Sequence, residues 1–151
     1  MHIHGVCDGS AYLDENYQYF LGISNFVNNK LMESGIISRE RVRLLYNGVE
    51  IENFEKRLSD LEKKEEKEKY GIRDKEKVIV FCGRTIKEKG VKELILAYKK
   101  IYKECDTKLI IVGNSNFANE VVTEYDRELK LIAEEIKDNV IFTGHISNKD
   151  L

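Results

Sequence analysis

The chain has 151 residues, of which 42% are hydrophobic and 34% charged; this is a globular profile with length for about one domain. Its 25 Lys and Arg residues against 27 Asp and Glu residues give a net charge of −2, which argues against a general nucleic-acid or polyanion binder. No apolar run approaches the roughly 20 residues of a membrane-spanning helix, and Met1–Gly5 has neither the basic start nor the apolar stretch of a secretory signal.

Three cysteines, Cys7, Cys82 and Cys105, lie far apart in the sequence. An odd number without a Cys-x-x-Cys pair argues against both a disulfide framework and a zinc ribbon. Because Cys82 ends the apolar run 78–82, we expect it to be a small core residue. We therefore expect three reduced thiols in a cytoplasmic protein.

The first part of the chain combines short strands with a helix. Residues 17–23 and 42–46 are rich in aromatic and branched side chains and are predicted strands. Between them, Ser24 is a good N-cap and Gly35 a good C-cap for a helix. Asn47–Gly48 then predicts a sharp turn, because both residues tolerate positive φ.

A highly charged segment follows, in which 12 of the 15 residues 55–69 are charged, six of each sign. Acid-before-base pairs such as Asp60 with Lys64 have helical i,i+4 spacing, and only Leu58 and Leu61 could anchor the segment. It is predicted to be a solvated helix in a connector, with a charged docking surface as the alternative.

After residue 77 the pattern becomes regular. Predicted strands at 78–82, 108–112 and 139–143 alternate with two amphipathic helices, which is typical of a Rossmann-like α/β fold whose parallel sheet is covered on both faces. Ligands of such sheets bind at the carboxyl ends of the strands. Each predicted strand is followed there by a glycine: Gly83, Gly113 and Gly144.

The last residues predict a further element. Ser147–Asp150 fits a capping box with Asp in place of Glu, so it should open another helix, yet the sequence ends at Leu151. Three parallel strands without that helix would leave apolar surface and a sheet edge uncovered. We therefore expect an incomplete domain.

The loop 83–90, GRTIKEKG, has the parts of a diphosphate site without being a Walker loop or a G-x-G-x-x-G motif. A glycine allows close backbone approach, and the following helix offers N–H donors at its positive end. Arg84 can grip phosphate oxygens in a fork, and Lys89 can add a point charge. The alternative is an exposed basic turn between a strand and a helix.

A family resemblance centres on residues 78–98, VIVFCGRTIKEKGVKELILAY, which look like the donor-site signature of family 4 glycosyltransferases with its Gly-Arg and Lys-Gly elements. Asn47–Glu50 and Phe54 resemble the family's interdomain Asn-Gly-Val-Asp…Phe segment, and Lys69–Ile72 resembles its connector. The runs KLIIVG and NVIFTGHI resemble its next two strands, so the similarity extends from about residue 17 to the end.

This resemblance implies the GT-B fold of two Rossmann-like domains. Residues 1–46 would be the end of the N-terminal acceptor domain, 47–76 the interdomain connector, and 77–151 the first half of the C-terminal nucleotide-sugar-binding domain. The implied reaction is transfer of a sugar, with retention, from a UDP- or GDP-linked donor to a glycan or lipid-linked acceptor in polysaccharide or glycoconjugate biosynthesis. No metal and no cofactor besides the donor are implied, and the full-length enzyme could associate peripherally with a membrane.

Carried over by residue, Arg84 and Lys89 would bind the donor diphosphate and stabilise the departing nucleotide. The backbone of Gly83, Gly113, Gly144, His145 and Ile146 would line the donor cleft. No complete catalytic set is expected, because the family's spaced glutamate pair would lie beyond the end of this sequence and most of the acceptor domain would precede it. Activity of these 151 residues alone is therefore not expected.

Tyr46, where the family commonly has proline, and Glu50, where it has aspartate, depart from the pattern at positions that a linker tolerates.

Two functions of other classes remain open. One is a non-catalytic module that binds nucleotide or phosphate through Arg84 and Lys89. The other is a metal-dependent hydrolase built on His2, His4, Cys7 and Asp8, because His-x-His is a metal-ligand spacing and His and Cys are good zinc ligands.

Overall fold

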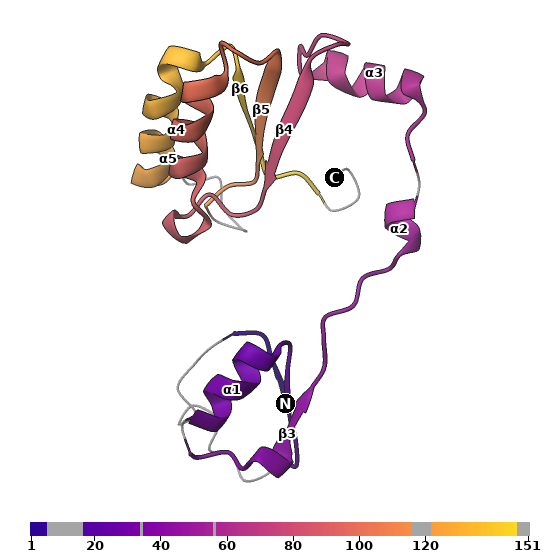
Figure 1. The fold of residues 1–151 in the computed structure, drawn as a ribbon, viewed down its shortest axis with the longest axis vertical. Coiled ribbons are helices and arrows are strands. Elements are labelled where there is room, and N and C mark those ends of the chain that lie inside the picture. The colour runs from indigo at the N-terminus through magenta and orange to yellow at the C-terminus, as the bar shows by residue number, and fades with distance from the viewer. Residues whose placement is uncertain (6–16, 34, 56, 116–121, 148–151) are drawn as a thin grey trace. The chain divides into compact units, whose positions relative to one another are not determined.

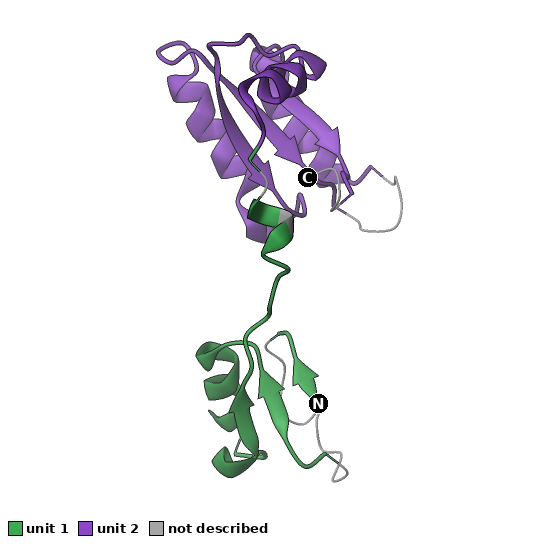
Figure 2. Ribbon diagram, turned by 90° about the vertical axis from the view of Figure 1, so that its right-hand side faces the viewer, with its two compact units in different colours: residues 1–57 green, residues 58–151 purple. Residues whose placement is uncertain are grey.

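The computed structural model describes residues 1–5, 17–33, 35–55, 57–115 and 122–147. The chain divides into two compact units, Met1–Arg57 and Leu58–Leu151 (Figure 2). Each unit is an α/β structure around its own parallel sheet (Figure 1). The predicted three-part division with a connector over 47–76 stays a prediction, and the capping box over 147–150 lies largely outside the described residues.

Unit 1 holds a small parallel sheet in the order β1-β2-β3, with one helix packed against it. Its elements are β1 (His2–Ile3), β2 (Phe20–Gly22), α1 (Asn25–Glu33), a 3₁₀ turn (Arg39–Arg41) and β3 (Val42–Leu44). The predicted cap is confirmed, because the Val27 amide donates to Ser24 Oγ at 3.2 Å. Phe20, Val27 and Leu31 form the centre of a buried apolar cluster. The strand at His2–Ile3 was not predicted.

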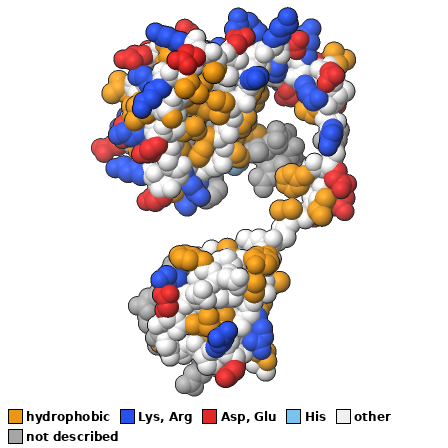
Figure 3. Space-filling model, viewed as in Figure 1, with side chains coloured by type: hydrophobic (Ala, Val, Ile, Leu, Met, Phe, Trp, Pro, Cys, Tyr) orange, Lys and Arg blue, Asp and Glu red, His pale blue; other side chains and the backbone are white. Residues whose placement is uncertain are grey.

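The segment after β3 differs from the turn predicted at Asn47–Gly48. Asn47 and Gly48 do not have positive φ, and residues 45–50 have no regular structure or turn. A short helix, α2 (Glu52–Glu55), follows. Val49, Ile51 and Phe54 are exposed, and Figure 3 shows apolar side chains along this segment. The predicted sharp turn at Asn47–Gly48 is therefore wrong.

The charged segment forms a solvated helix, α3 (Asp60–Lys69), which begins later than predicted. Ser59 is the N-cap of α3 and forms a capping box with Glu62, whose Oε2 accepts from the Ser59 amide at 2.8 Å. Its described ion pairs have i,i+3 spacing, as in Lys63 to Asp60 at 3.0 Å, and not the predicted i,i+4 spacing. The expected anchors Leu58 and Leu61 are both exposed.

Unit 2 carries a three-stranded parallel sheet in the order β4-β5-β6, as the alternating pattern predicts. The register pairs Ile79 with Leu109 and Leu109 with Val140. The elements after α3 are β4 (Lys77–Cys82), a 3₁₀ turn (Lys87–Lys89), α4 (Val91–Ile101), β5 (Thr107–Val112), α5 (Glu124–Ala133), a 3₁₀ turn (Glu134–Ile136) and β6 (Val140–Gly144).

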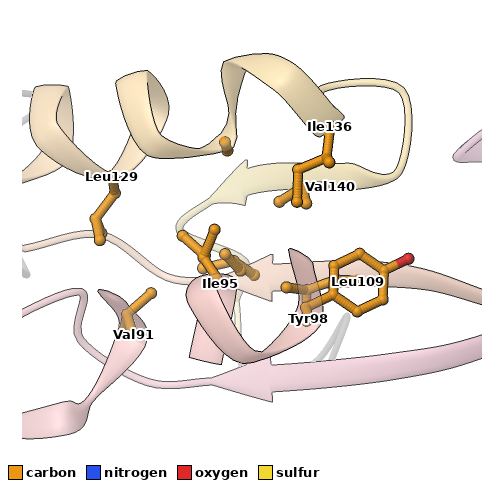
Figure 4. Packing of buried hydrophobic residues seen from close by; sticks show 9 residues of the cluster. Val91, Ile95, Tyr98, Leu109, Leu129, Ile136 and Val140 are labelled. Atoms are coloured by element: carbon orange, nitrogen blue, oxygen red, sulfur yellow. The ribbon is translucent and has the colours of Figure 1, made fainter. Parts of the chain in front are cut away.

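The main core lies between this sheet and the helices α4 and α5, which cover one of its faces (Figures 1 and 4). Ile95, Leu109 and Leu129 meet there from two helices and the central strand, each almost fully buried. Tyr98 also enters the core, and its hydroxyl donates to the Thr107 carbonyl at 2.7 Å, which satisfies the polar end of the ring. This packing fixes the ends of α4 and α5 relative to the strands.

The other sheet face is covered less completely than predicted. Ile72, Ile110 and Val112 form a small buried cluster on it, whereas Val80 of β4 remains 59% exposed. Cys82 is likewise exposed, so its prediction as a core residue is wrong. The reason is that β4 lies at one end of the described strand order, where fewer neighbours cover its side chains. No described helix is both long and apolar enough to cross a bilayer.

Candidate functional site

The three predicted glycines meet at the carboxyl edge of the unit 2 sheet. The Gly83 amide donates to the Val112 carbonyl at 3.0 Å, and the Gly113 amide donates to the Gly144 carbonyl at 2.8 Å. Gly113 has φ +122°, and a Cβ atom placed there would lie 2.0 Å from the Gly83 carbonyl oxygen. Close backbone approach at this edge therefore requires glycine at position 113.

Arg84 and Lys89 lie on the loop that leaves this edge and enters α4. Arg84 directly follows Gly83, and both cations are exposed. Lys89 ends a 3₁₀ turn in which its amide donates to the Ile86 carbonyl at 3.0 Å. Gly90, with φ +69°, then reverses the chain into α4. The loop thus presents three exposed cationic side chains, Arg84, Lys89 and Lys87 between them, beside the N-terminus of an 11-residue helix, which is an arrangement suited to anionic oxygens.

A buried threonine holds this loop to the neighbouring one. Thr85 is only 3% exposed. Its amide donates to the Asn114 carbonyl at 3.1 Å, and its hydroxyl donates to Asp126 Oδ1 at 2.9 Å. The loops that follow β4 and β5 are therefore joined through backbone and side chain directly after the Gly83–Gly113 contact.

Asp126, in the first turn of α5, is the centre of this hydrogen-bond network. Its Oδ2 accepts from the Ser115 hydroxyl at 2.7 Å and from the Thr123 hydroxyl and amide at 2.7 and 2.9 Å. Burial alone would raise the pKa of Asp126, but the hydrogen bonds from Ser115, Thr123 and Thr85 outweigh burial and lower this pKa below its usual value. Asp126 is therefore held as a carboxylate.

The third predicted part of the cleft follows β6. His145 is exposed, and the side chain of Ile146 packs against the small cluster of Ile72, Ile110 and Val112. That packing anchors the segment to the sheet and leaves its backbone next to Gly144. The assignment of His145 and Ile146 to a donor cleft stays a prediction.

The competing metal cluster is divided between described and undescribed residues. The rings of His2 and His4 lie in unit 1 with their centroids 4.3 Å apart, whereas Cys7 and Asp8 are outside the described residues. Within the described ranges, no three His, Cys, Asp or Glu side chains are grouped so that they could hold a metal ion. His145 belongs to the other unit.

Asp126 is the site residue that the sequence analysis missed. The run Thr123-Glu124-Tyr125-Asp126 is a capping-box pattern and could have been read as the start of α5. Its contact with Thr85, 41 residues away, has no signal in a single sequence.

A parallel sheet with glycines at its carboxyl edge and a cationic loop entering a helix is typical of proteins with Rossmann-like α/β domains. The family model described as "Glycosyl transferases group 1" matches residues 62–151. The chain belongs to this family, and the predicted glycosyltransferase class is confirmed at that level.

Curated relatives support the assignment. The chain is 29% identical over 147 residues to the "Putative glycosyltransferase YtcC" of Bacillus subtilis, covering 95% of this chain and 36% of that protein. It is 33% identical over 107 residues to the "Alpha-monoglucosyldiacylglycerol synthase" of Streptococcus pneumoniae, covering 70% of this chain and 23% of that protein. The chain thus spans about a quarter to a third of the length of these relatives.

Two solved structures, one of them described as a glycosyltransferase, share the fold. The complex of Anabaena Alr3699/HepE with UDP and glucose matches with a TM-score of 0.78 at 18% identity, covering 97% of this chain and 41% of that one. A glycosyltransferase from Rickettsia africae matches with a TM-score of 0.79 at 20% identity, covering 97% and 40%. The predicted α/β fold of GT-B type is therefore confirmed.

Proposed function

We propose that this chain supplies donor-binding elements of a retaining family 4 glycosyltransferase that uses a UDP- or GDP-linked sugar. The observation that carries the proposal is the cationic loop 83–90 at the glycine-lined carboxyl edge of the unit 2 sheet. The family match over residues 62–151 includes this loop and edge. The fold neighbour HepE is described in complex with UDP-glucose, which supports a nucleotide-sugar donor.

In the proposed reaction, Arg84 and Lys89 act on the donor diphosphate. The guanidinium of Arg84 can form paired hydrogen bonds with phosphate oxygens, and the Lys89 ammonium adds a second positive charge. Negative charge grows on the diphosphate as the glycosidic bond breaks, so both cations would stabilise the transition state more than the bound donor. Gly83, Gly113 and Gly144 would allow the ligand to approach the backbone closely.

The acceptor is proposed to be a glycan or a lipid-linked sugar. Relatives named for a glucosyldiacylglycerol synthase and for capsular polysaccharide biosynthesis support this range. Peripheral contact of the whole enzyme with a membrane is part of the proposal, since a lipid-linked acceptor would lie at a membrane. A cytoplasmic location is proposed as well. It is supported by the free, exposed thiols of Cys82 and Cys105, since a reducing compartment preserves such thiols.

Calorimetric titration of UDP and GDP into the wild-type chain and its Arg84→Ala and Lys89→Ala variants tests the proposal. Losing a charge-assisted hydrogen bond should weaken binding about tenfold or more in each variant. Lys100→Ala removes an exposed cation from the other end of α4 and serves as the matched control, which should bind as the wild type does. Equal affinities in all four proteins, or no binding by the wild type, would refute the diphosphate assignment.

A further inference from the structure

One carboxylate connects three segments around the proposed diphosphate site. Asp126 accepts from Thr85 in the loop after β4, from Ser115 in the loop after β5, and from Thr123 at the start of α5. These donors are 41, 11 and 3 residues from it in sequence. Asp126 is thus a point of convergence for the loops and not only the cap of its own helix.

The two carboxylate oxygens divide these roles. Oδ2 accepts from Thr123, which completes the capping box of α5, and from Ser115 in the neighbouring loop. Among the described hydrogen bonds, Oδ1 accepts only the one from the Thr85 hydroxyl. The Oδ1 bond is not needed to cap α5, and its effect is to hold the loop that carries Arg84 against α5.

The position of Thr85 makes this bond effective. Thr85 is buried, whereas Arg84 beside it is exposed. The backbone at Thr85 is fixed by the Asn114 carbonyl and its side chain by Asp126. Since a guanidinium binds a diphosphate best when little chain entropy is lost on binding, a loop fixed at Thr85 favours recognition by Arg84.

We propose that Asp126 is a positioning residue of the diphosphate site, acting through the Thr85 hydroxyl to fix the loop that carries Arg84. This inference rests on the proposed function for its ligand. The fixing of the loop itself needs no ligand and can be measured separately.

Amide hydrogen exchange of the unliganded chain tests the fixing of the loop. Thr85→Val keeps the side-chain shape but removes the donor, and Thr85→Ser keeps the donor. In Thr85→Val, the amides of residues 85, 89 and 90 should exchange about tenfold faster, as expected for loss of a hydrogen bond to a charged group. The Ile95 amide in α4 should be unchanged, and Thr85→Ser should remain within about twofold of the wild type.

A matched control comes from α5 itself. Glu128→Gln breaks the half-buried ion pair with Lys92 and leaves Asp126 in place, so it should not change exchange at Thr85. Asp126→Asn should accelerate exchange there, because it removes the charge and one acceptor oxygen. Unchanged exchange at Thr85 in both Thr85→Val and Asp126→Asn would overturn the proposal.

A double-mutant cycle with UDP then tests the link to Arg84. Thr85→Val should weaken UDP binding about fivefold in the wild-type background and have no further effect in Arg84→Ala, because the loop acts through that side chain. Independent, multiplicative effects would overturn the positioning role. If the wild type does not bind UDP, the proposed function fails, and the exchange experiment still decides whether Asp126 fixes the loop.

Discussion

Replacing Gly113 by alanine should severely destabilise unit 2. The added Cβ atom would lie 2.0 Å from the Gly83 carbonyl oxygen and 2.9 Å from its carbon, and these backbone atoms cannot rotate away as a side chain could. Overpacking of this kind costs about 1–3 kcal/mol, and the φ of +122° adds about 1–3 kcal/mol of strain for a residue with a side chain. We therefore expect a loss of about 2–6 kcal/mol in the free energy of unfolding.

Urea unfolding, followed by circular dichroism and by amide signals of unit 2, measures this loss. Gly71→Ala is the control, since Gly71 is in the same unit, has φ +63° and has open space where its Cβ would lie. It should lose only about 1 kcal/mol, from the left-handed backbone alone. If Gly113→Ala and Gly71→Ala unfold at the same urea concentration, the close approach of Gly113 to Gly83 is not a constraint and the reasoning fails.

Three further predictions concern unit 2. The pKa of Asp126 is lower in the folded chain than in the unfolded chain, so the unfolded chain takes up a proton first as the pH falls. The stability that this carboxylate contributes is therefore present above about pH 4 and lost below it. Asp126→Asn should flatten the acid side of a plot of the free energy of unfolding against pH. Tyr98→Phe removes the buried hydroxyl bond to Thr107 and should cost about 1–2 kcal/mol by urea unfolding. Ser59→Ala should reduce the helical signal of α3 at 222 nm by circular dichroism while hardly moving the main unfolding transition, because no residue of α3 is buried.

Hydrophobic periodicity predicted the order of elements from β4 to β6 because α4, α5 and the central strand β5 bury continuous apolar faces. The stripe through Val91, Ile95 and Tyr98 is the face that α4 packs on the sheet. How exposed a strand's side chains are depends instead on which elements pack beside that strand, and a sequence pattern does not show this. Val80 and Cys82 belong to an apolar run but lie on the terminal strand of the described order, so they remain exposed.

Turn chemistry was less informative than apolar pattern. Asn47–Gly48 has the composition of a turn, yet no turn forms there. Permissive residues allow a positive φ without requiring one, so their occurrence is weak evidence. Gly113 differs because the Gly83 carbonyl occupies the place of its side chain, a contact that only the folded sheet creates. The sequence pattern singled out both Gly48 and Gly113. Only the structure shows that the fold requires a glycine at position 113 and not at position 48.

The candidate site separates residues that build the site from residues that would contact the ligand. Gly113 and Asp126 hold the sheet edge and loops through close backbone approach and hydrogen bonds within the fold, whereas Arg84 and Lys89 are exposed on that support. Substituting Gly113 or Asp126 should therefore lower both the stability of unit 2 and its affinity for a diphosphate. Substituting Arg84 or Lys89 should lower the affinity with little change in stability. A site of this construction needs only local positive charge, so a net charge of −2 is compatible with the proposed binding of an anionic donor.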